Sequence, residues 1–384
     1  MKFLSKILNL NEKYLYLSII LIFVLITFYH LNNGLHTASD TLRFSRWADD
    51  LISVNFNLYN FYFSDTANQE RIPPIFFFLP IFLISLCKVF FTNDWQLAFL
   101  FLNLFFLFLS LIIFVKTLLL LRVTSFLILL SSFLILISAD ILTWPRYMLS
   151  DMNFAFLVIV LNYFIAEGIV NNRFNKLLIF LILFLMLITR PSSIPFIFAA
   201  LIFLIFSKSK ILHKPKEILI FLLILLILTP LLFATFYYLI EFKFSQIQHL
   251  KWLSSMVKDG MIIHDRPETW LNVPNNFFDV MNLYFSRLIN FFNPYAETFS
   301  FIHIALNIIL SGFIALSVFV WFIFGEKNIL EHKMILFIII MSFFTAAFHS
   351  FTLIDYDWRY RFPIIMPLIM IFPISLQMIL KKKI

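Results

Sequence analysis

Charged residues and glycines are both scarce in this sequence. Charged residues make up only 13% of the chain, and its 384 residues include only 5 Gly. Soluble domains carry about 25% charged residues, and their helices have polar faces. Hydrophobic residues account for 62% of this chain, and its apolar segments have almost no polar face. The composition excludes a soluble globular protein and predicts an all-α polytopic membrane protein.

Cysteine content and the common nucleotide-binding and metal-binding motifs give no further indication of function. The single cysteine, Cys87, lies in an apolar run, so no intramolecular disulfide can form. The sequence has no Walker loop, no dinucleotide-binding glycine pattern and no HExxH motif, and its 8 His form no ligand-spaced pair. The basic residues lie in short clusters between apolar segments, so the net charge of +8 does not indicate nucleic-acid binding.

Apolar segments recur along the whole chain. Most are near the length of about 20 residues that crosses a hydrocarbon core of about 30 Å. They cover residues 14–30, 73–91, 95–115, 123–142, 153–169, 177–189, 193–207, 217–240, 301–324, 334–348 and 363–380. No internal repeat or low-complexity linker divides them, so residues 1–384 are expected to form a single transmembrane domain.

Basic clusters predict the orientation of these segments. Lysines at both ends of the chain place both termini in the cytoplasm, which requires an even number of crossings. Segment 73–91 is the best candidate for one that does not cross, since it carries three prolines and Lys88. We therefore expect about ten transmembrane helices plus one interfacial or re-entrant element. Loops 31–72 and 241–300 would face outward, with the bacterial inner (plasma) membrane as the expected location.

The first outward loop carries an acidic and basic pattern. Asp40, Arg43 and Trp47 are spaced i, i+3, i+7, so they share one face of a short amphipathic helix along the membrane surface. The spacing alone favours a capping box, with Thr37 as the N-cap and Asp40 bonding back to it. Ser150 or Asp151 is expected to cap the helix that follows residue 150.

Arginines gather on the predicted outer side, against the usual charge bias. Arg43 has an ordinary interpretation as an interfacial anchor, and Arg359 and Arg361 as partners of nearby Asp residues. Arg146 is harder to explain in this way and needs a partner or an anionic ligand. As a set they are better explained by an anionic ligand, because guanidinium groups bind phosphate through two parallel hydrogen bonds. The set is Arg43, Arg71, Arg146, Arg190, Arg359 and Arg361.

Several of these motifs resemble the GT-C superfamily of polyprenyl-phosphate-sugar glycosyltransferases, in particular the aminoarabinose transferases and protein O-mannosyltransferases. The resemblance covers nearly the whole chain. Each motif is loose, but their order along the chain and their predicted side of the membrane agree with the family. They are Asp40-Thr41-Leu42-Arg43, Arg71-Ile72-Pro73-Pro74, Tyr147-Met148-Leu149-Ser150-Asp151, Thr189-Arg190-Pro191 and Arg359-Tyr360-Arg361-Phe362-Pro363. The 384 residues are fewer than those of the large members, and no C-terminal soluble domain is expected.

The resemblance implies a GT-C-like fold and the transfer of a sugar from a polyprenyl-phosphate donor to a hydroxyl of a cell-envelope acceptor, with inversion. It implies that Asp40 is the general base and that Asp151 is a second acidic residue at the catalytic centre. Donor phosphate would be bound by Arg43, Arg71, Arg359 and Arg361, and substrate by Arg146, Tyr147 and Arg190. Some members of the superfamily use a divalent metal and others do not, so the resemblance leaves a divalent metal open as a cofactor.

Two other classes stay open at this point. One is a transporter or flippase of a lipid-linked or anionic substrate, and the other is a polymerase or ligase of surface polysaccharide. Ion-coupled transporters usually have charges and broken helices at mid-membrane, and here the charged residues lie mostly outside the apolar segments. Essential residues at the outer mouth would favour the glycosyltransferase, and essential residues at mid-membrane would favour transport.

Overall fold

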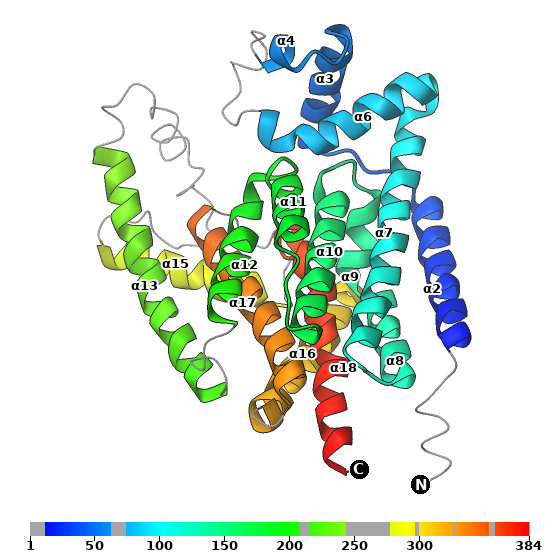
Figure 1. The fold of residues 1–384 in the computed structure, drawn as a ribbon. Helices are drawn as coiled ribbons and strands as arrows, with labels where there is room; N and C mark the ends of the chain where they lie inside the picture. The colour runs from blue at the N-terminus through cyan, green and yellow to red at the C-terminus, as the bar shows by residue number, and fades with distance from the viewer. Residues whose placement is uncertain are drawn as a thin grey trace.

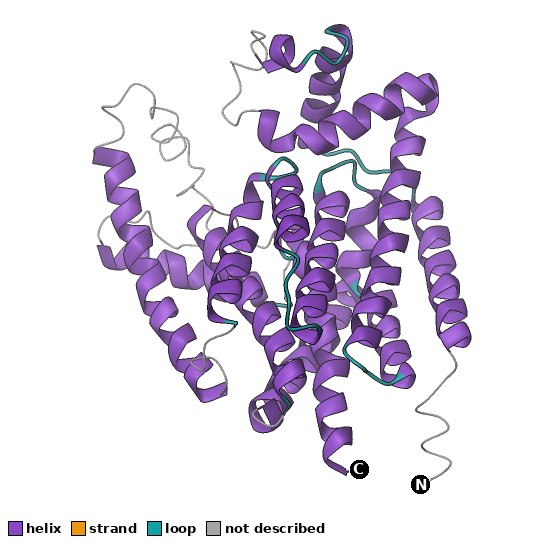
Figure 2. Ribbon diagram, in the orientation of Figure 1, coloured by secondary structure: helices purple, strands orange, loops and turns teal. Residues whose placement is uncertain are grey.

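The computed structural model describes residues 12–62, 74–207, 215–242, 277–295, 299–325, 328–352 and 358–383. Within these ranges all regular elements are helices, and strand-like pairing is limited to one bridge between His36 and Tyr147. Figure 2 shows this helical content throughout the molecule. The prediction of an all-α fold is confirmed.

Six helical stretches in the described ranges are long and apolar enough to cross a membrane. In Figure 1 they run through one bundle, and apolar side chains on the outside of α2 and α16 are exposed, as lipid-facing surfaces require. The chain is a multi-pass membrane protein. The stretches hold α2 (Glu12–Asn33), α7 (Trp95–Leu120), α10 (Asp151–Val170), α16 (Phe301–Phe324), α17 (Ile329–Thr352) and α18 (Phe362–Lys383).

The apolar segment 123–142 does not form one continuous helix. The segment forms α8 (Ser125–Leu136), then α9 (Ala139–Thr143) and η3 (Trp144–Arg146), with a bend of 54° at the break. Ser138 has extended backbone angles at the break, which end one helix and begin the next. Counted as one bent span, the pair brings the candidate spans to seven.

The total of about ten crossings stays a prediction. Two expected segments form helices shorter than a usual span, α11 (Lys176–Leu187) and α12 (Ile194–Phe206). Segment 217–240 lies in α13 (Pro215–Phe242), which contains Pro230. The short α15 (Phe277–Phe292) packs against α13 and α17.

Helix α6 (Phe78–Phe91) lies across the end of the bundle rather than along it (Figure 1). It follows η1 (Pro74–Phe77) and turns into α7 through η2 (Thr92–Asp94). The backbone N–H of Leu79 donates to the carbonyl of Ile188 at 3.0 Å, which ties α6 to the end of α11. The expectation that 73–91 forms an interfacial or re-entrant element stays a prediction.

The amphipathic helix expected in the first loop is α3 (Ser39–Ser53), and it packs on α6 with α4 (Leu58–Tyr62) beside it (Figure 1). Phe44, Trp47 and Leu51 are fully buried in this contact. The rings of Trp47 and Phe77 stack with centroids 6.1 Å apart. A rigid apolar platform therefore supports the face of α3 that carries Asp40 and Arg43.

Candidate active site

The candidate active site is centred on the carboxylate of Asp151, the first residue of α10. This side chain is only 1% exposed. Arg359, in η9 (Trp358–Tyr360), donates from Nε to both carboxylate oxygens at 3.1 and 2.9 Å. Arg190, between α11 and η4 (Pro191–Ser193), also pairs with this carboxylate through Nη1. Two guanidinium groups therefore neutralise one buried acid, as a buried charge requires.

Arg359 also reaches the first loop. Its Nη1 lies 3.0 Å from Oδ2 of Asp40, and Nη2 of Arg43 lies 2.9 Å from Oδ1 of the same carboxylate. One guanidinium thus bridges the carboxylates of Asp40 and Asp151. The structure brings together five residues singled out in the sequence, Asp40, Arg43, Asp151, Arg190 and Arg359.

Backbone contacts explain why the first loop meets the start of α10. The N–H of His36 donates to the carbonyl of Arg146 at 3.1 Å, and the N–H of Met148 donates to the carbonyl of His36 at 3.3 Å. Asn103, a polar residue on the apolar helix α7, donates from its amide to the carbonyls of Pro145 and Tyr147 at 3.0 and 3.1 Å. These contacts fix the turn that leads into Asp151.

The expected capping box at the start of α3 is wrong. The N-cap position is Ala38, whose N–H donates to the hydroxyl of Thr41 at 2.9 Å. The Thr41 hydroxyl donates in turn to the carbonyl of Met148 at 3.0 Å. The carboxylate of Asp40 instead pairs with two arginines, Arg43 and Arg359.

The two carboxylates differ in accessibility. The side chain of Asp40 is 30% exposed, whereas that of Asp151 is 1% exposed. Burial acts to raise the pKa of Asp40, but the charges of Arg359 and then Arg43 outweigh it and lower the pKa below its usual value. Asp40 is therefore ionised at neutral pH and is accessible to solvent, while Asp151 is placed to orient Arg190 and Arg359.

At the start of α10, Ser150 occupies the expected N-cap position. Its hydroxyl is buried and makes no hydrogen bond, so it caps by position only. Asp151 supplies the negative charge that favours a helix N-terminus. The capping interpretation of Asp151 and a role in the charged cluster are therefore compatible.

Aromatic rings pack against the guanidinium groups of Arg190 and Arg43. The guanidinium carbon of Arg190 lies 4.7 Å from the ring centroid of Tyr360, and that of Arg43 lies 5.2 Å from the ring of Trp47. The Tyr360 ring packs on His349 of α17 with centroids 4.4 Å apart. Sequence reasoning missed His349, and the available signal was an ionisable residue in the last turn of an apolar helix.

Arg361 belongs to a second charged pair. Its Nε lies 3.6 Å from Oδ2 of Asp140 in α9, and its Nη1 donates to the carbonyl of Asn293 at 3.0 Å. No contact joins it to the carboxylates of Asp40 or Asp151 among the interactions of the described residues. Asp140 is 1% exposed and was also missed, although it is the lone acid within apolar segment 123–142.

An apolar cavity begins at this second pair. It has a volume of about 440 Å³ and runs between α16, α17 and α18, with Asp140 and Arg361 among its lining residues. Most of the remaining wall is aliphatic or aromatic, including Leu310, Ile339 and Phe343. This end of the bundle therefore combines guanidinium groups with a space suited to a hydrocarbon chain.

Arg146 stands apart from both pairs. In the part of the chain that the structure describes it forms no ion pair, and its Nε is buried without a hydrogen-bond partner. The neighbouring Tyr147 stacks on His36 at 5.2 Å. Burial, and then the charge of Arg146, lower the pKa of His36. Arg146 is thus a cation without a carboxylate partner beside the first loop.

Two expectations concern ligands, namely phosphate binding by Arg71 and a divalent metal. Arg71 lies outside the described residues. Across those residues, no group of three or more His, Cys, Asp and Glu side chains is arranged to hold a metal ion. Asp40 and Asp151 are occupied by arginines instead.

Comparisons of the chain with family models, curated proteins and solved structures gave no match. What the protein does must therefore be argued from the geometry of this site and from the sequence motifs.

Proposed function

We propose that this protein is a GT-C-like membrane glycosyltransferase that moves a sugar from a polyprenyl-phosphate carrier to a hydroxyl of a cell-envelope lipid, glycan or protein. The observation that carries the proposal is the bridge made by Arg359 between the part-exposed Asp40 and the buried Asp151. Such a cluster offers a base, and beside it the cations that a departing phosphate needs.

In this reaction Asp40 accepts the proton of the acceptor hydroxyl. The freed oxygen attacks the anomeric carbon from the face opposite the phosphate, the bond from that carbon to the phosphate oxygen breaks, and the carrier phosphate leaves with the electron pair. A single displacement inverts the anomeric centre. Arg43 and Arg359 stabilise the charge that develops on the phosphate.

The ion pairs of Asp40 suggest how donor binding prepares the base. Arg43 and Arg359 lower the basicity of Asp40 while they contact it. A donor phosphate that draws these guanidinium groups away from the carboxylate raises the pKa of Asp40. The base then becomes stronger only when the sugar donor is in place.

The apolar cavity beside Arg361 supports a lipid-linked donor. Its aliphatic lining suits isoprenoid units, and Arg361 at one end suits the phosphate that follows them. A water-soluble sugar nucleotide would not need such a space. The first lipid units after the phosphate would lie between α16, α17 and α18.

The test is an assay of the purified full-length protein with a panel of polyprenyl-phosphate sugars and an extract of envelope acceptors. Sugar-dependent release of polyprenyl phosphate, with the sugar recovered on an acceptor, supports the proposal. Absence of release with every donor, together with movement of labelled carrier across the membrane of proteoliposomes, would replace the glycosyltransferase with the flippase alternative.

A further inference from the structure

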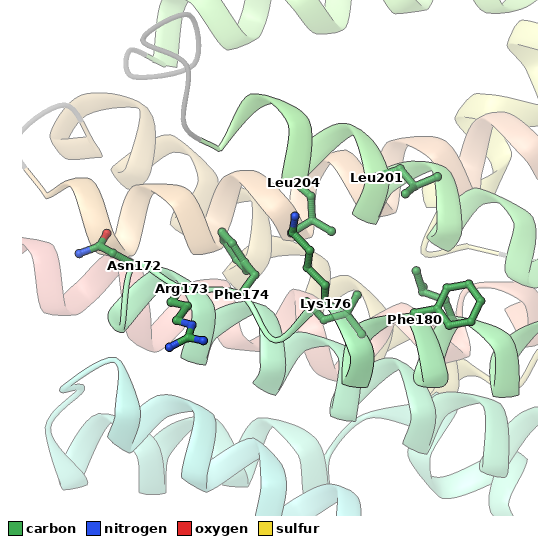
Figure 3. A pocket seen from close by; sticks show the side chains of 9 residues that line it. Asn172, Arg173, Phe174, Lys176, Phe180, Leu201 and Leu204 are labelled. Atoms are coloured by element: carbon green, nitrogen blue, oxygen red, sulfur yellow. The ribbon is translucent and has the colours of Figure 1, made fainter.

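A second cavity lies at the end of the bundle away from the candidate active site. Asp151 begins α10, and the cavity is lined by residues that follow the end of this helix at Val170. At a rise of 1.5 Å per residue, the two ends of α10 are about 30 Å apart. The cavity has a volume of about 700 Å³ and is formed by the turn after α10 together with α11 and α12. Figure 3 shows its lining side chains.

The rim of this cavity is cationic. Arg173 and Lys176 both line it, both are exposed, and neither forms an ion pair with any residue in the described ranges. Lys176 is also the first residue of α11. Asn175 caps one N–H of the first turn by accepting from Leu178 at 3.2 Å, which leaves other first-turn N–H groups directed outward. A helix N-terminus with two added cations favours a phosphate group.

The wall below this rim is apolar and open to the lipid. Phe180 of α11 is 69% exposed, and Leu201 of α12 is 47% exposed. The ring of Phe174 packs directly on Gly168, so closely that a Cβ atom at position 168 would lie 2.1 Å from the ring. This contact fixes the position of Phe174. The cavity thus joins a phosphate-binding rim to a fixed hydrocarbon surface.

We infer that this cavity binds an anionic phospholipid of the leaflet opposite the candidate active site. The lipid phosphate contacts Arg173, Lys176 and the N-terminus of α11, and an acyl chain lies along Phe180 and Leu201. Basic pockets between transmembrane helices on the cytoplasmic side bind anionic headgroups in this way. The inference does not depend on the proposed glycosyl transfer.

The experiment is native mass spectrometry of the full-length protein in detergent, titrated with phosphatidylglycerol or with phosphatidylcholine of the same acyl chains. The wild type should bind phosphatidylglycerol more tightly. The double variant Arg173→Gln/Lys176→Gln should bind it about thirtyfold more weakly, since each basic residue near an anionic lipid surface contributes about 1 kcal/mol. Its affinity for phosphatidylcholine should change little.

A matched control removes the same charge elsewhere. Lys116 and Arg122 lie at the end of α7, both are exposed, and neither forms an ion pair within the described ranges. The variant Lys116→Gln/Arg122→Gln should keep the preference for phosphatidylglycerol. Equal loss in both double variants, no preference in the wild type, or displacement of the lipid by millimolar inorganic phosphate alone would each overturn the inference.

Discussion

Nη1 of Arg359 lies 3.0 Å from Oδ2 of Asp40, although 319 positions separate the two residues in the chain. The same guanidinium holds Asp151 through Nε, so one side chain near the C-terminus joins the first loop to the start of α10. The relative position of the two acids therefore depends on Arg359.

Replacement of Arg359 by lysine should keep the charge and lose the bridge. A lysine ammonium is a single point donor and cannot contact both carboxylates with fixed geometry. Arg359→Lys should therefore raise the KM for the polyprenyl-phosphate donor and lower kcat, measured by release of polyprenyl phosphate. Arg122→Lys, at the far end of α7, is the control and should behave as the wild type. Wild-type kinetics for Arg359→Lys would show that the bridge is not needed for turnover.

Asp151→Asn should destabilise the protein. The side chain is 1% exposed and compensates the buried Arg190, which is itself 4% exposed. Loss of one partner of a buried ion pair leaves an uncompensated charge and costs about 3–5 kcal/mol. The measurement is the Tm of the detergent-solubilised variant against that of Asp94→Asn, an exposed acid in η2. An unchanged Tm for Asp151→Asn would mean that the pair contributes little to stability.

The bundle was largely predictable, since a run of about 20 apolar residues has few alternatives to a membrane helix. The bend after α8 was not. Ser138 and Asp140 hardly lower the mean hydropathy of segment 123–142, yet helix α8 ends before them and α9 begins at Ala139. Hydropathy measures whether a segment is apolar, and not whether its backbone stays straight.

The sequence predicted which residues form the candidate site better than it predicted which of them pair with one another. Asp40, Arg43, Asp151, Arg190 and Arg359 were all expected on one side of the membrane, and residues on one side meet at one end of a bundle. Arg359 and Arg361 were expected to act together, but residues two apart on a helical turn do not share a face. Arg361 contacts Asp140 instead. Asp140 and His349 were missed although a lone ionisable residue in or beside an apolar segment is a signal of a functional position.

Removal of Arg43 should shift the pH dependence. Burial acts to raise the pKa of Asp40, and the charges of Arg359 and Arg43 lower it below the usual value of about 3.9. The ionised base is thus present above that range and is lost only as pH falls through the lowered pKa. Arg43→Gln removes one of these charges, so the acid limb of kcat/KM should move to higher pH. An acid limb at the same pH in both proteins would argue that Asp40 is not the titrating group.

Asp40→Asn separates a catalytic role from a structural one. The N-cap of α3 is formed by Ala38 and Thr41, so the change leaves helix capping intact. If Asp40 is the general base, turnover should fall by roughly 10²–10⁴-fold, the range for general acid–base catalysis. The measurement is release of polyprenyl phosphate at matched concentrations of folded protein.

Asp49→Asn is the matched control for this change, because it lies on the same helix and its carboxylate also pairs with a cation, Lys88, at 2.7 Å. Its side chain is 63% exposed, and loss of such a surface pair costs about 0–1 kcal/mol. Turnover of Asp49→Asn should therefore stay near that of the wild type. Donor binding should persist in both variants, since Arg43, Arg190 and Arg359 remain. Near-wild-type turnover of Asp40→Asn would move the role of base to another group and leave Asp40 as a partner that positions Arg359.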